Sequence, residues 1–325
     1  MSGEFGIVRR CFAPLAKGEA ALGLGDDAAV FSPPPGRSLV ATADAMISGV
    51  HFLPDDPPDT IARKLLRVNL SDLAAMGAEP LGYLLTCAWP KGWKEDWIEG
   101  FAQGLAEDQE RYGIALLGGD TVGTPGTLSL SLTALGTVEA GRAMTRSGAR
   151  VGDSVFVSGT LGRAAFGLLV RRGGLLGLNQ DLRTALTEAY RLPDPRLDLG
   201  RALVEKRLAT ACLDVSDGLL ADLGHICQAS GLGAVLWSEH LPLSEPVQEA
   251  VAEDLETFPL VLTGGDDYEL CFTAAPGAAE ELMSLAQQLG LPLTQVGEMQ
   301  GGSGVRVLDR DGNALIVQAE GWQHF

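Results

Sequence analysis

Leucines at positions 128, 130 and 132 alternate with serine and threonine near the middle of the chain. A period of two residues is typical of a half-buried antiparallel strand. Residues 38–47 (SLVATADAMI) predict another strand, which carries Asp44 near its end. Residues 114–117 predict a third, which delivers Gly118-Gly119-Asp120. The first 140 residues therefore contain strands whose ends carry acidic side chains.

Two helices are predicted between these strands. One begins with Asp59 as its N-cap and runs to about Met76, where Gly77 ends it, and leucines at 66, 70 and 73 form its apolar stripe. The other covers residues 94–112, with apolar residues at four-residue intervals and Gly113 at its end.

Asn69 and Asp72 lie three residues apart on the first helix, beside its apolar stripe. Residues three apart share one face of a helix. Asp72 is therefore expected to point out at the edge of the core, towards whatever Asp44 faces.

A second cycle of strands and helices follows residues 139–152, a segment rich in glycine, arginine and small residues that we interpret as a domain boundary. An irregular stretch around Pro193 and Pro195 interrupts this cycle, and residues 309–312 predict a hairpin turn. The alternation predicts an α/β or α+β protein. The expected strands are 154–158, 211–215, 234–237 and 270–273, and the expected helices run from the turn at Gly159 to about 172, through a segment before 211, and over 219–230.

Length and charge narrow the class of protein. The 325 residues favour two domains, and 24 Lys and Arg against 42 Asp and Glu give a formal net charge of -18. This balance disfavours binding to nucleic acid or anionic membranes and attracts divalent cations, although acidity alone also serves solubility. Five cysteines in apolar contexts without a Cys-x-x-Cys pair suggest buried, reduced thiols. With no signal-peptide pattern and no apolar run of about 20 residues, we expect a cytoplasmic protein.

Acidic residues stand beside glycine in four clusters, each next to a predicted strand: Gly25-Asp26-Asp27, Gly118-Gly119-Asp120, Asp214-Val215-Ser216-Asp217-Gly218 and Gly264-Gly265-Asp266-Asp267. Any single Asp-Gly pair is more often an ordinary turn. Four such clusters in one chain suggest carboxylates gathered to hold Mg²⁺ ions against phosphates, with glycine allowing close approach of the ligand.

The chain lacks the sequence motifs of other phosphate-binding proteins and of hydrolases. The chain has no P-loop, no Gly-x-Gly-x-x-Gly after a strand, no protein-kinase motif and no Gly-x-Ser-x-Gly elbow, and its four histidines are scattered. Oxygen ligands without nitrogen or sulfur select Mg²⁺ or Mn²⁺. The candidate ligands are Asp27, Asp44, Asp72, Asp120, Asp214 and Asp217. Arg146 could supply positive charge to phosphate oxygens that metal does not reach, although alone it could be a surface ion-pair partner.

The chain contains a series of short sequence motifs in an order that resembles the thiamine-monophosphate kinase family of the aminoimidazole ribonucleotide synthetase superfamily. The matching strings span almost the whole chain: Gly3-Glu4-Phe5, Leu24-Gly25-Asp26-Asp27-Ala28, Asp44 with His51-Phe52, residues 69–77 (NLSDLAAMG), Gly118-Gly119-Asp120-Thr121, Thr145-Arg146-Ser147-Gly148, residues 214–219 (DVSDGL) and residues 267–272 (DYELCF).

The resemblance implies a two-domain aminoimidazole ribonucleotide synthetase-like fold and a homodimer. Residues 1–140 would form the ATP- and Mg²⁺-binding and dimerisation domain, whose sheets pair across the dimer. Residues 150–325 would form an α/β domain that completes the active site. The reaction would transfer a phosphoryl group from ATP to thiamine monophosphate, giving thiamine diphosphate and ADP.

The resemblance also implies roles for individual residues. Asp44, Asp72, Asp120 and Arg146 would be catalytic. The Mg²⁺ ligands would be Asp27, Thr42, Ala43, Asp44, Asp72, Asp120, Asp214 and Asp217. ATP would contact Gly119, Asp120, Arg146 and Ser216, with Tyr112 a weaker candidate. Thiamine monophosphate would face His51, Asp266 and Trp322.

Two departures from the family pattern affect single contacts. Ala43 stands where relatives commonly have a hydroxyl residue, so a metal contact there would use its backbone carbonyl. Asp266 stands where relatives often have the longer Glu. The alternatives are another ATP-dependent synthetase of the superfamily, or a non-catalytic regulator that binds ATP and metal. Cys11 lacks the motif of a selenophosphate synthetase, and the chain does not end in the cysteine of the hydrogenase-maturation protein.

Overall fold

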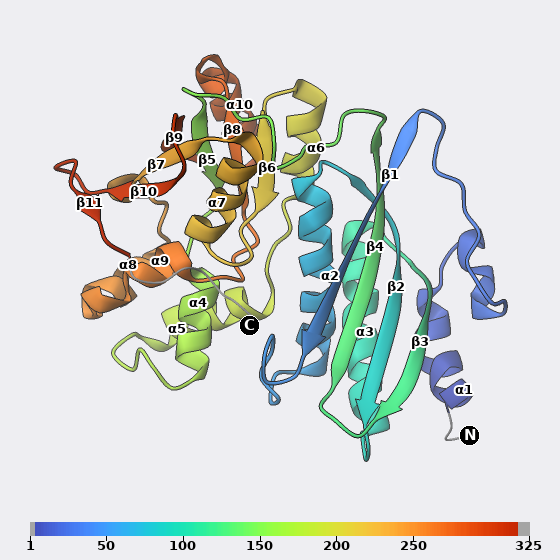
Figure 1. Cartoon of the computed structure of the whole chain (residues 1–325). Coiled ribbons are helices and arrows are strands. Elements are labelled where there is room, and N and C mark those ends of the chain that lie inside the picture. Colours follow the sequence, from blue (N-terminus) through green and yellow to red (C-terminus); the bar gives the residue numbers. More distant parts are fainter. Residues whose placement is uncertain (1–3, 318–325) are drawn as a thin grey trace. The chain divides into compact units, whose positions relative to one another are not determined.

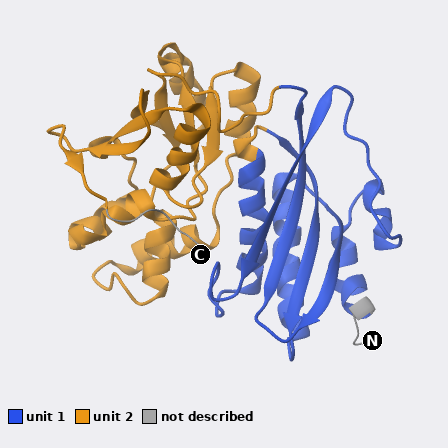
Figure 2. Ribbon diagram, viewed as in Figure 1, with its two compact units in different colours: residues 1–73, 78–141 blue, residues 74–77, 142–325 orange. Residues whose placement is uncertain are grey.

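The computed structural model describes residues 4–317, which form two compact units (Figure 2). Unit 1 comprises Met1–Leu73 and Ala78–Gly141, and unit 2 comprises Ala74–Gly77 and Arg142–Phe325. Trp322 lies outside the described residues.

Unit 1 is a four-stranded sheet with two long helices along one face (Figure 1). Its strands lie in the order β1-β4-β2-β3, and only β2 and β3 are parallel. The strands are β1 (Arg37–Ile47), β2 (Glu79–Pro90), β3 (Leu116–Thr124) and β4 (Ser129–Glu139), and the long helices are α2 (Pro58–Ala75) and α3 (Glu95–Tyr112). Short helical turns precede them over Glu4–Ile7 (α1), Val8–Phe12, Ala13–Leu15 and Glu19–Leu24.

The structure confirms both helices and the strands β1 and β4 that the apolar periodicities predict. Leu66, Leu70 and Leu73 are fully buried against the sheet, and Gly113 ends α3 in a left-handed conformation. Leucines 130 and 132 are buried on β4, whereas the serines and threonine between them are half-buried.

Three local predictions in unit 1 were wrong. Helix α2 begins at Pro58, so Asp59 lies in its first turn rather than at its N-cap, because proline is well suited to the first helical position. Gly118, Gly119 and Asp120 lie inside β3 instead of following it, since glycine-containing backbone can still pair with β2. Residues after Gly25-Asp26-Asp27 form no strand. Strand β2 was not predicted at all.

Unit 2 is a seven-stranded mixed sheet in the order β11-β10-β7-β9-β5-β8-β6, in which β7 and β10 are the parallel pair. Its strands are β5 (Ser154–Ser158), β6 (Ala211–Asp214), β7 (Gly233–Trp237), β8 (Leu270–Ala274), β9 (Leu293–Gln300), β10 (Gly304–Leu308) and β11 (Ala314–Leu315). Its helices are α4 (Arg163–Arg171), α5 (Gln180–Arg191), α6 (Leu197–Lys206), α7 (Leu219–Ser230), α8 (Glu245–Glu253), α9 (Pro259–Thr263) and α10 (Ala279–Leu289).

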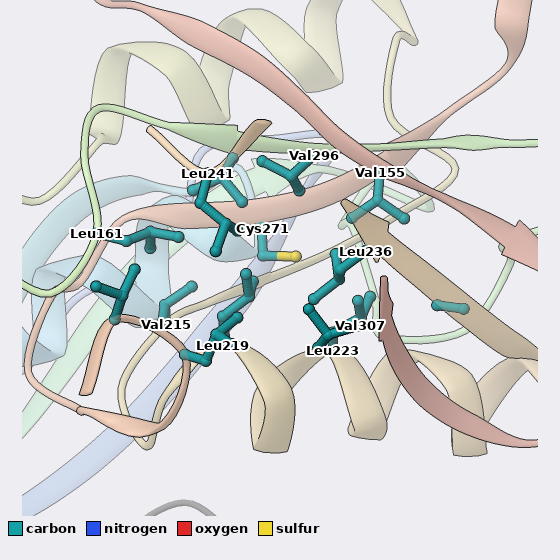
Figure 3. Packing of buried hydrophobic residues seen from close by; sticks show 14 of the residues in the cluster. Val155, Leu161, Val215, Leu219, Leu223, Leu236, Leu241, Cys271, Val296 and Val307 are labelled. Atoms are coloured by element: carbon teal, nitrogen blue, oxygen red, sulfur yellow. The ribbon is translucent and has the colours of Figure 1, made fainter. Parts of the chain in front are cut away.

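A continuous apolar core joins the sheet of unit 2 to helix α7 (Figure 3). Leu219 and Leu223, one helical turn apart on α7, are fully buried beside strand residues such as Leu236 and Cys271. The predicted strands β5 to β8 and helix α7 are confirmed to within about one residue, as is the hairpin turn between β10 and β11. The helix expected after Gly159 and the one expected before residue 211, whose bounds were not predicted, correspond to α4 and α6. The stretch before Pro193, however, contains helix α5. The prediction for the cysteines is also confirmed, because all five are free and buried.

Candidate active site

Asp44 on β1 and Asp72 on α2 form a pair of carboxylates inside unit 1. The backbone N–H of Asp44 donates to Asn69 Oδ1 (3.2 Å), and the hydroxyl of Thr42 donates to Asp72 Oδ2 (2.5 Å). Burial, together with the charge of Asp72, raises the pKa of Asp44 to about 6. Asp72 contacts Thr42, two residues before Asp44 on the same face of β1, and its charge acts on Asp44, so it lies on the side that Asp44 faces, as its spacing from Asn69 predicts.

This pair has the donor chemistry of a Mg²⁺ site. Two carboxylates and a hydroxyl are hard oxygen donors, and a cation between them would offset both the burial and the neighbouring charge that raise the pKa of Asp44. Among residues 4–317, no group of three or more His, Cys, Asp or Glu side chains could hold a metal ion by itself. A Mg²⁺ ion here would thus need further oxygens from its phosphate ligand or from water, as is usual for this ion.

A pocket of about 190 Å³ in unit 1 brings together other predicted residues. Asp27, Gly119 and Asp120 line it, together with Asp26, which was not predicted, and apolar side chains such as Phe12. Asp120 Oδ1 accepts from the N–H of Thr121 (2.8 Å). A Cβ atom on Gly119 would lie 1.9 Å from the carbonyl oxygen of Leu85, so β3 can pair with β2 here only through glycine.

His51 follows β1 in a tight turn that fixes both its ring and its backbone. Its Nδ1 accepts from the N–H of Ile47 (3.0 Å), and its carbonyl oxygen accepts from the buried Lys64 Nζ (3.1 Å). A neutral imidazole whose Nδ1 accepts must carry its proton on Nε2, so the ring can present a donor to a phosphate oxygen. Sequence reasoning missed Lys64, whose spacing on α2 gave no sign of this contact.

Tyr112 ends helix α3 among cations. Its ring centroid lies 5.6 Å from the guanidinium carbon of Arg67 and 5.2 Å from that of Arg111. These distances are within the range of cation–π contacts. The structure thus places this weaker ATP candidate on unit 1, at the end of α3.

In unit 2 the two remaining acidic clusters lie against each other. Asp214 ends β6 and is buried, and the loop from Val215 to Gly218 leads into α7. The N–H of Asp266 donates to the carbonyl oxygen of Ser216 (2.9 Å). The predicted residues Asp214, Ser216, Asp217 and Asp266 therefore belong to one pair of adjoining loops.

The segment that carries Arg146 runs beside β6. The carbonyl oxygen of Thr145 accepts from the N–H of Cys212 (2.9 Å), two residues before Asp214. Gly148 adopts a φ of 122°, and a Cβ atom there would lie 2.4 Å from the carbonyl oxygen of Thr210. Glycine at this position allows the segment to lie against the strand.

Two further carboxylates of unit 2, Asp222 and Asp267, accept hydrogen bonds from backbone N–H groups. Asp222 Oδ2 accepts from three successive N–H groups of residues 216–218, and Asp267 accepts from the N–H groups of Gly162 and Ala164 at the start of α4. Burial raises the pKa of each to about 7, and the amide donors offset part of this rise. An acid four residues after a helix-starting glycine was the only sequence signal for Asp222.

Comparison with known proteins defines the class to which this architecture belongs. Residues 25–138 match the N-terminal domain, and residues 150–310 the C-terminal domain, of AIR synthase related proteins. The hydrogenase maturation protein HypE in complex with ATP has the same fold, with a TM-score of 0.79 at 18% identity over 98% of this chain and 95% of that one. The chain is a two-domain AIR synthase related protein.

Nearer relatives define its family. Thiamine-monophosphate kinase from Caulobacter vibrioides is 43% identical over 99% of this chain and 90% of its own length, and that from Escherichia coli K12 is 38% identical over 99% and 98%. The crystal structure of the enzyme from Stenotrophomonas maltophilia has a TM-score of 0.85 at 43% identity, over 96% of this chain and 98% of that one. AaThiL complexed with AMPPCP and TMP has a TM-score of 0.78 at 31% identity, over 99% and 97%. The chain belongs to the thiamine-monophosphate kinase family.

Proposed function

We propose that the protein phosphorylates thiamine monophosphate at the expense of ATP, giving thiamine diphosphate and ADP. The observation that carries the proposal is the half-buried pair of Asp44 and Asp72, held by hydrogen bonds to Asn69 and Thr42 as hard oxygen donors, in a chain similar along its whole length to thiamine-monophosphate kinases. The relative that binds AMPPCP, an ATP analogue, together with TMP supports both substrates.

Mg²⁺, when bound, would supply the positive charge that lets two polyanions approach each other. From unit 1 the ligands would be Asp27, Asp44, Asp72, Asp120, Thr42 and the carbonyl of Ala43, and from unit 2 Asp214 and Asp217. The short bond from the Thr42 hydroxyl to Asp72 supports a role for Thr42 in orienting that carboxylate, with or without direct contact to the metal.

Substrates would be held by side chains that carry positive charge or hydrogen-bond donors. Gly119, Asp120, Arg146, Ser216 and Tyr112 would contact the nucleotide. His51, Asp266 and Trp322 would face thiamine monophosphate, and the Nε2–H tautomer of His51 suits a phosphate acceptor. The hydrogen bond between the backbones of Asp266 and Ser216 supports a link between the residues proposed for thiamine monophosphate and those proposed for the nucleotide.

The chemical step needs no general base. An oxygen of thiamine monophosphate is largely ionised near neutral pH, because the second pKa of a phosphate monoester is about 6. That oxygen attacks the γ-phosphorus of ATP in line, the bond from this phosphorus to the β,γ-bridging oxygen breaks, and ADP leaves with the electron pair. We propose direct transfer, which a phosphate label found covalently on the protein would contradict.

The domain roles and the oligomer form part of the proposal. Residues 1–140 would be the nucleotide, Mg²⁺ and dimerisation domain, and residues 150–325 the α/β domain that completes the active site. Exposed apolar side chains on the sheet of unit 1, such as Leu39, Leu84 and Val122, support a homodimer.

The test is a product assay with purified protein, MgATP and thiamine monophosphate, with thiamine diphosphate followed by chromatography. Asp72→Asn should lower kcat/KM at least 100-fold, because a charged ligand beside Asp44 is lost. Asp59→Asn, an acid in the first turn of the same helix, is the matched control and should stay within about twofold. Free thiamine should give no product. A folded wild-type protein that binds ATP but forms no diphosphate would overturn the proposal.

A further inference from the structure

The loop between β6 and α7 carries Ser216 and Asp217, and only four residues separate Asp214 at the end of the strand from Leu219 at the start of the helix. Such a short connection leaves several backbone N–H groups without partners in a strand or helix, and buried backbone donors need partners. Where these N–H groups point decides what the loop can bind.

All three N–H groups of residues 216, 217 and 218 point at one atom, Oδ2 of Asp222. The distances are 3.0, 3.0 and 3.1 Å. Asp222 lies in the first turn of α7 and is buried. Successive N–H groups that converge in this way form a concavity that binds anions such as phosphate in other proteins. Here a carboxylate of the chain itself fills it.

The carbonyl side of the same loop is also held. Ser216 O accepts from the N–H of Asp266 (2.9 Å), and Val215 O accepts from that of Tyr268 (2.8 Å). Asp266 and Tyr268 both adopt positive φ angles, which are costly for non-glycine residues and mark a backbone held in place by its surroundings.

The packing leaves this loop little freedom. A Cβ atom on Gly265 would lie 2.3 Å from Ser216 O, and one on Gly218 would lie 2.7 Å from the carbonyl carbon of Thr263. The two loops therefore contact each other through their backbones, and Asp222 binds the N–H groups of residues 216–218 in the first of them.

We propose that Asp222 is a positioning residue, whose carboxylate fixes the loop of residues 216–218 so that the side chains of Ser216 and Asp217, rather than the loop amides, meet the metal–nucleotide ligand. The assignment of that ligand rests on the proposed function. Because the amides are already occupied, a phosphate cannot take them, and the loop offers a hydroxyl and a carboxylate. This donor set suits a divalent cation that carries a nucleotide.

Loss of Asp222 should weaken ligand binding through the loop. Without the carboxylate, the N–H groups of residues 216–218 lose their common acceptor, and the loop must be ordered again whenever the ligand binds. Removal of a group that orients metal ligands typically costs 10- to 100-fold in metal affinity or activity. The half-saturating Mg²⁺ concentration and the KM for ATP should therefore rise more than kcat falls.

The experiment compares Asp222→Ala and Asp222→Asn with a matched control, Asp153→Ala. Asp153 is a buried carboxylate of the same unit whose Oδ2 accepts from the N–H of Arg150 and from the hydroxyl of Thr210, just before β6 begins. We would measure melting temperature, kcat, KM for ATP and the Mg²⁺ dependence of each, and amide hydrogen exchange over residues 214–222.

The expected result is that both alanine variants lose stability, but only Asp222→Ala raises the Mg²⁺ and ATP requirements, by about tenfold or more. Exchange at residues 216–218 should accelerate, and Asp222→Asn, which keeps one acceptor oxygen, should recover much of the loss. Equal kinetic changes in both alanine variants, or unchanged exchange in Asp222→Ala, would overturn the proposal. If the wild type makes no thiamine diphosphate, calorimetric binding of Mg²⁺ and AMPPCP to the same proteins still decides the role of Asp222 separately.

Discussion

At the scale of single residues, the hydroxyl of Thr42 makes one hydrogen bond in the candidate metal site. Replacing Thr42 therefore tests that hydrogen bond alone. The hydroxyl donates to Asp72 at 2.5 Å, and the half-buried carboxylate beside it, Asp44, has a raised pKa. The hydroxyl thus fixes the orientation of the Asp72 carboxylate through its Oδ2.

Thr42→Val is expected to raise the half-saturating Mg²⁺ concentration about 10-fold, because a hydrogen bond to a charged group contributes about 1.5–3 kcal/mol. Thr42→Ser keeps the hydroxyl and should stay within about threefold of the wild type. Thr133→Val, a half-buried threonine on β4, is the control. Titration of activity with Mg²⁺ measures all four proteins, and an unchanged requirement in Thr42→Val would show that the hydroxyl does not orient the site.

Residue-level sequence reasoning succeeded where geometry is local. Residues three apart along a helix return to one face, so the spacing of Asn69 and Asp72 is enough to direct both side chains towards Asp44. It failed where the contact depends on how a loop folds back. The carboxylate of Asp222 reaches three N–H groups four to six residues before it, and nothing in residue type distinguishes it from a solvated helical acid.

At the scale of elements, helices α2 and α3 are joined by a buried ion pair. Arg67 on α2 binds Asp108 on α3 through two hydrogen bonds, of 2.6 and 2.9 Å, and the two side chains are 3% and 1% exposed. Arg63 adds a third contact to Asp108 at 3.2 Å. A buried pair with this bidentate geometry fixes the register of the two helices, whereas its net contribution to stability against an apolar pair is small.

Asp108→Ala is expected to lower the free energy of unfolding by about 3–5 kcal/mol, because Arg67 would remain buried without its carboxylate. Its neighbour Glu107 is largely exposed and contacts Arg63 at 3.5 Å, so Glu107→Ala should cost less than about 1 kcal/mol. Urea denaturation gives both values. A replacement of both partners, Arg67→Met with Asp108→Leu, should recover most of the loss, and failure to recover it would show that the charges themselves are needed.

Elements with a clear period were predictable, and those without one were not. Leucine spacing identified α2 and β4, and alternation with glycine punctuation identified β6, α7 and β8. Strand β2 was missed because its residues are apolar or small on both faces, so no period of two stands out. Helix α5 was missed because the prolines that follow it suggested an irregular stretch, although proline commonly follows a helix end.

At the scale of the whole molecule, helices α2 and α3 cover one face of the unit 1 sheet (Figure 1), and apolar side chains are exposed on the other face. Along β1 the residues from Leu39 to Ile47 with odd numbers are exposed, and those between them are more buried. The pairing aligns Ala43 with Thr133 and Thr133 with Leu84, so the exposed row continues across the sheet. Leu39, Ile47, Leu84 and Val122 are 37–46% exposed. We define these four residues as the open sheet face.

The open sheet face bears on oligomeric state because contiguous apolar surface on a sheet is normally covered. The second copy of the chain is the occupant that the family resemblance predicts, with the sheets of the two copies paired across the interface into a barrel-like core. Small residues such as Ala41, Ala43 and Ala45 along β1 would allow two sheets to approach closely, as sheet packing at about 10 Å requires.

Leu84→Arg is therefore expected to convert a dimer into a monomer, since a charge buried without a partner costs several kcal/mol on each side of a twofold interface. Leu255→Arg is the matched control, because Leu255 is 75% exposed on unit 2 and belongs to no such face. Light scattering coupled to size exclusion would show a dimer for the wild type and for Leu255→Arg, and a folded monomer for Leu84→Arg. A wild-type monomer, or a dimer that persists in Leu84→Arg, would mean that the open sheet face is not the interface.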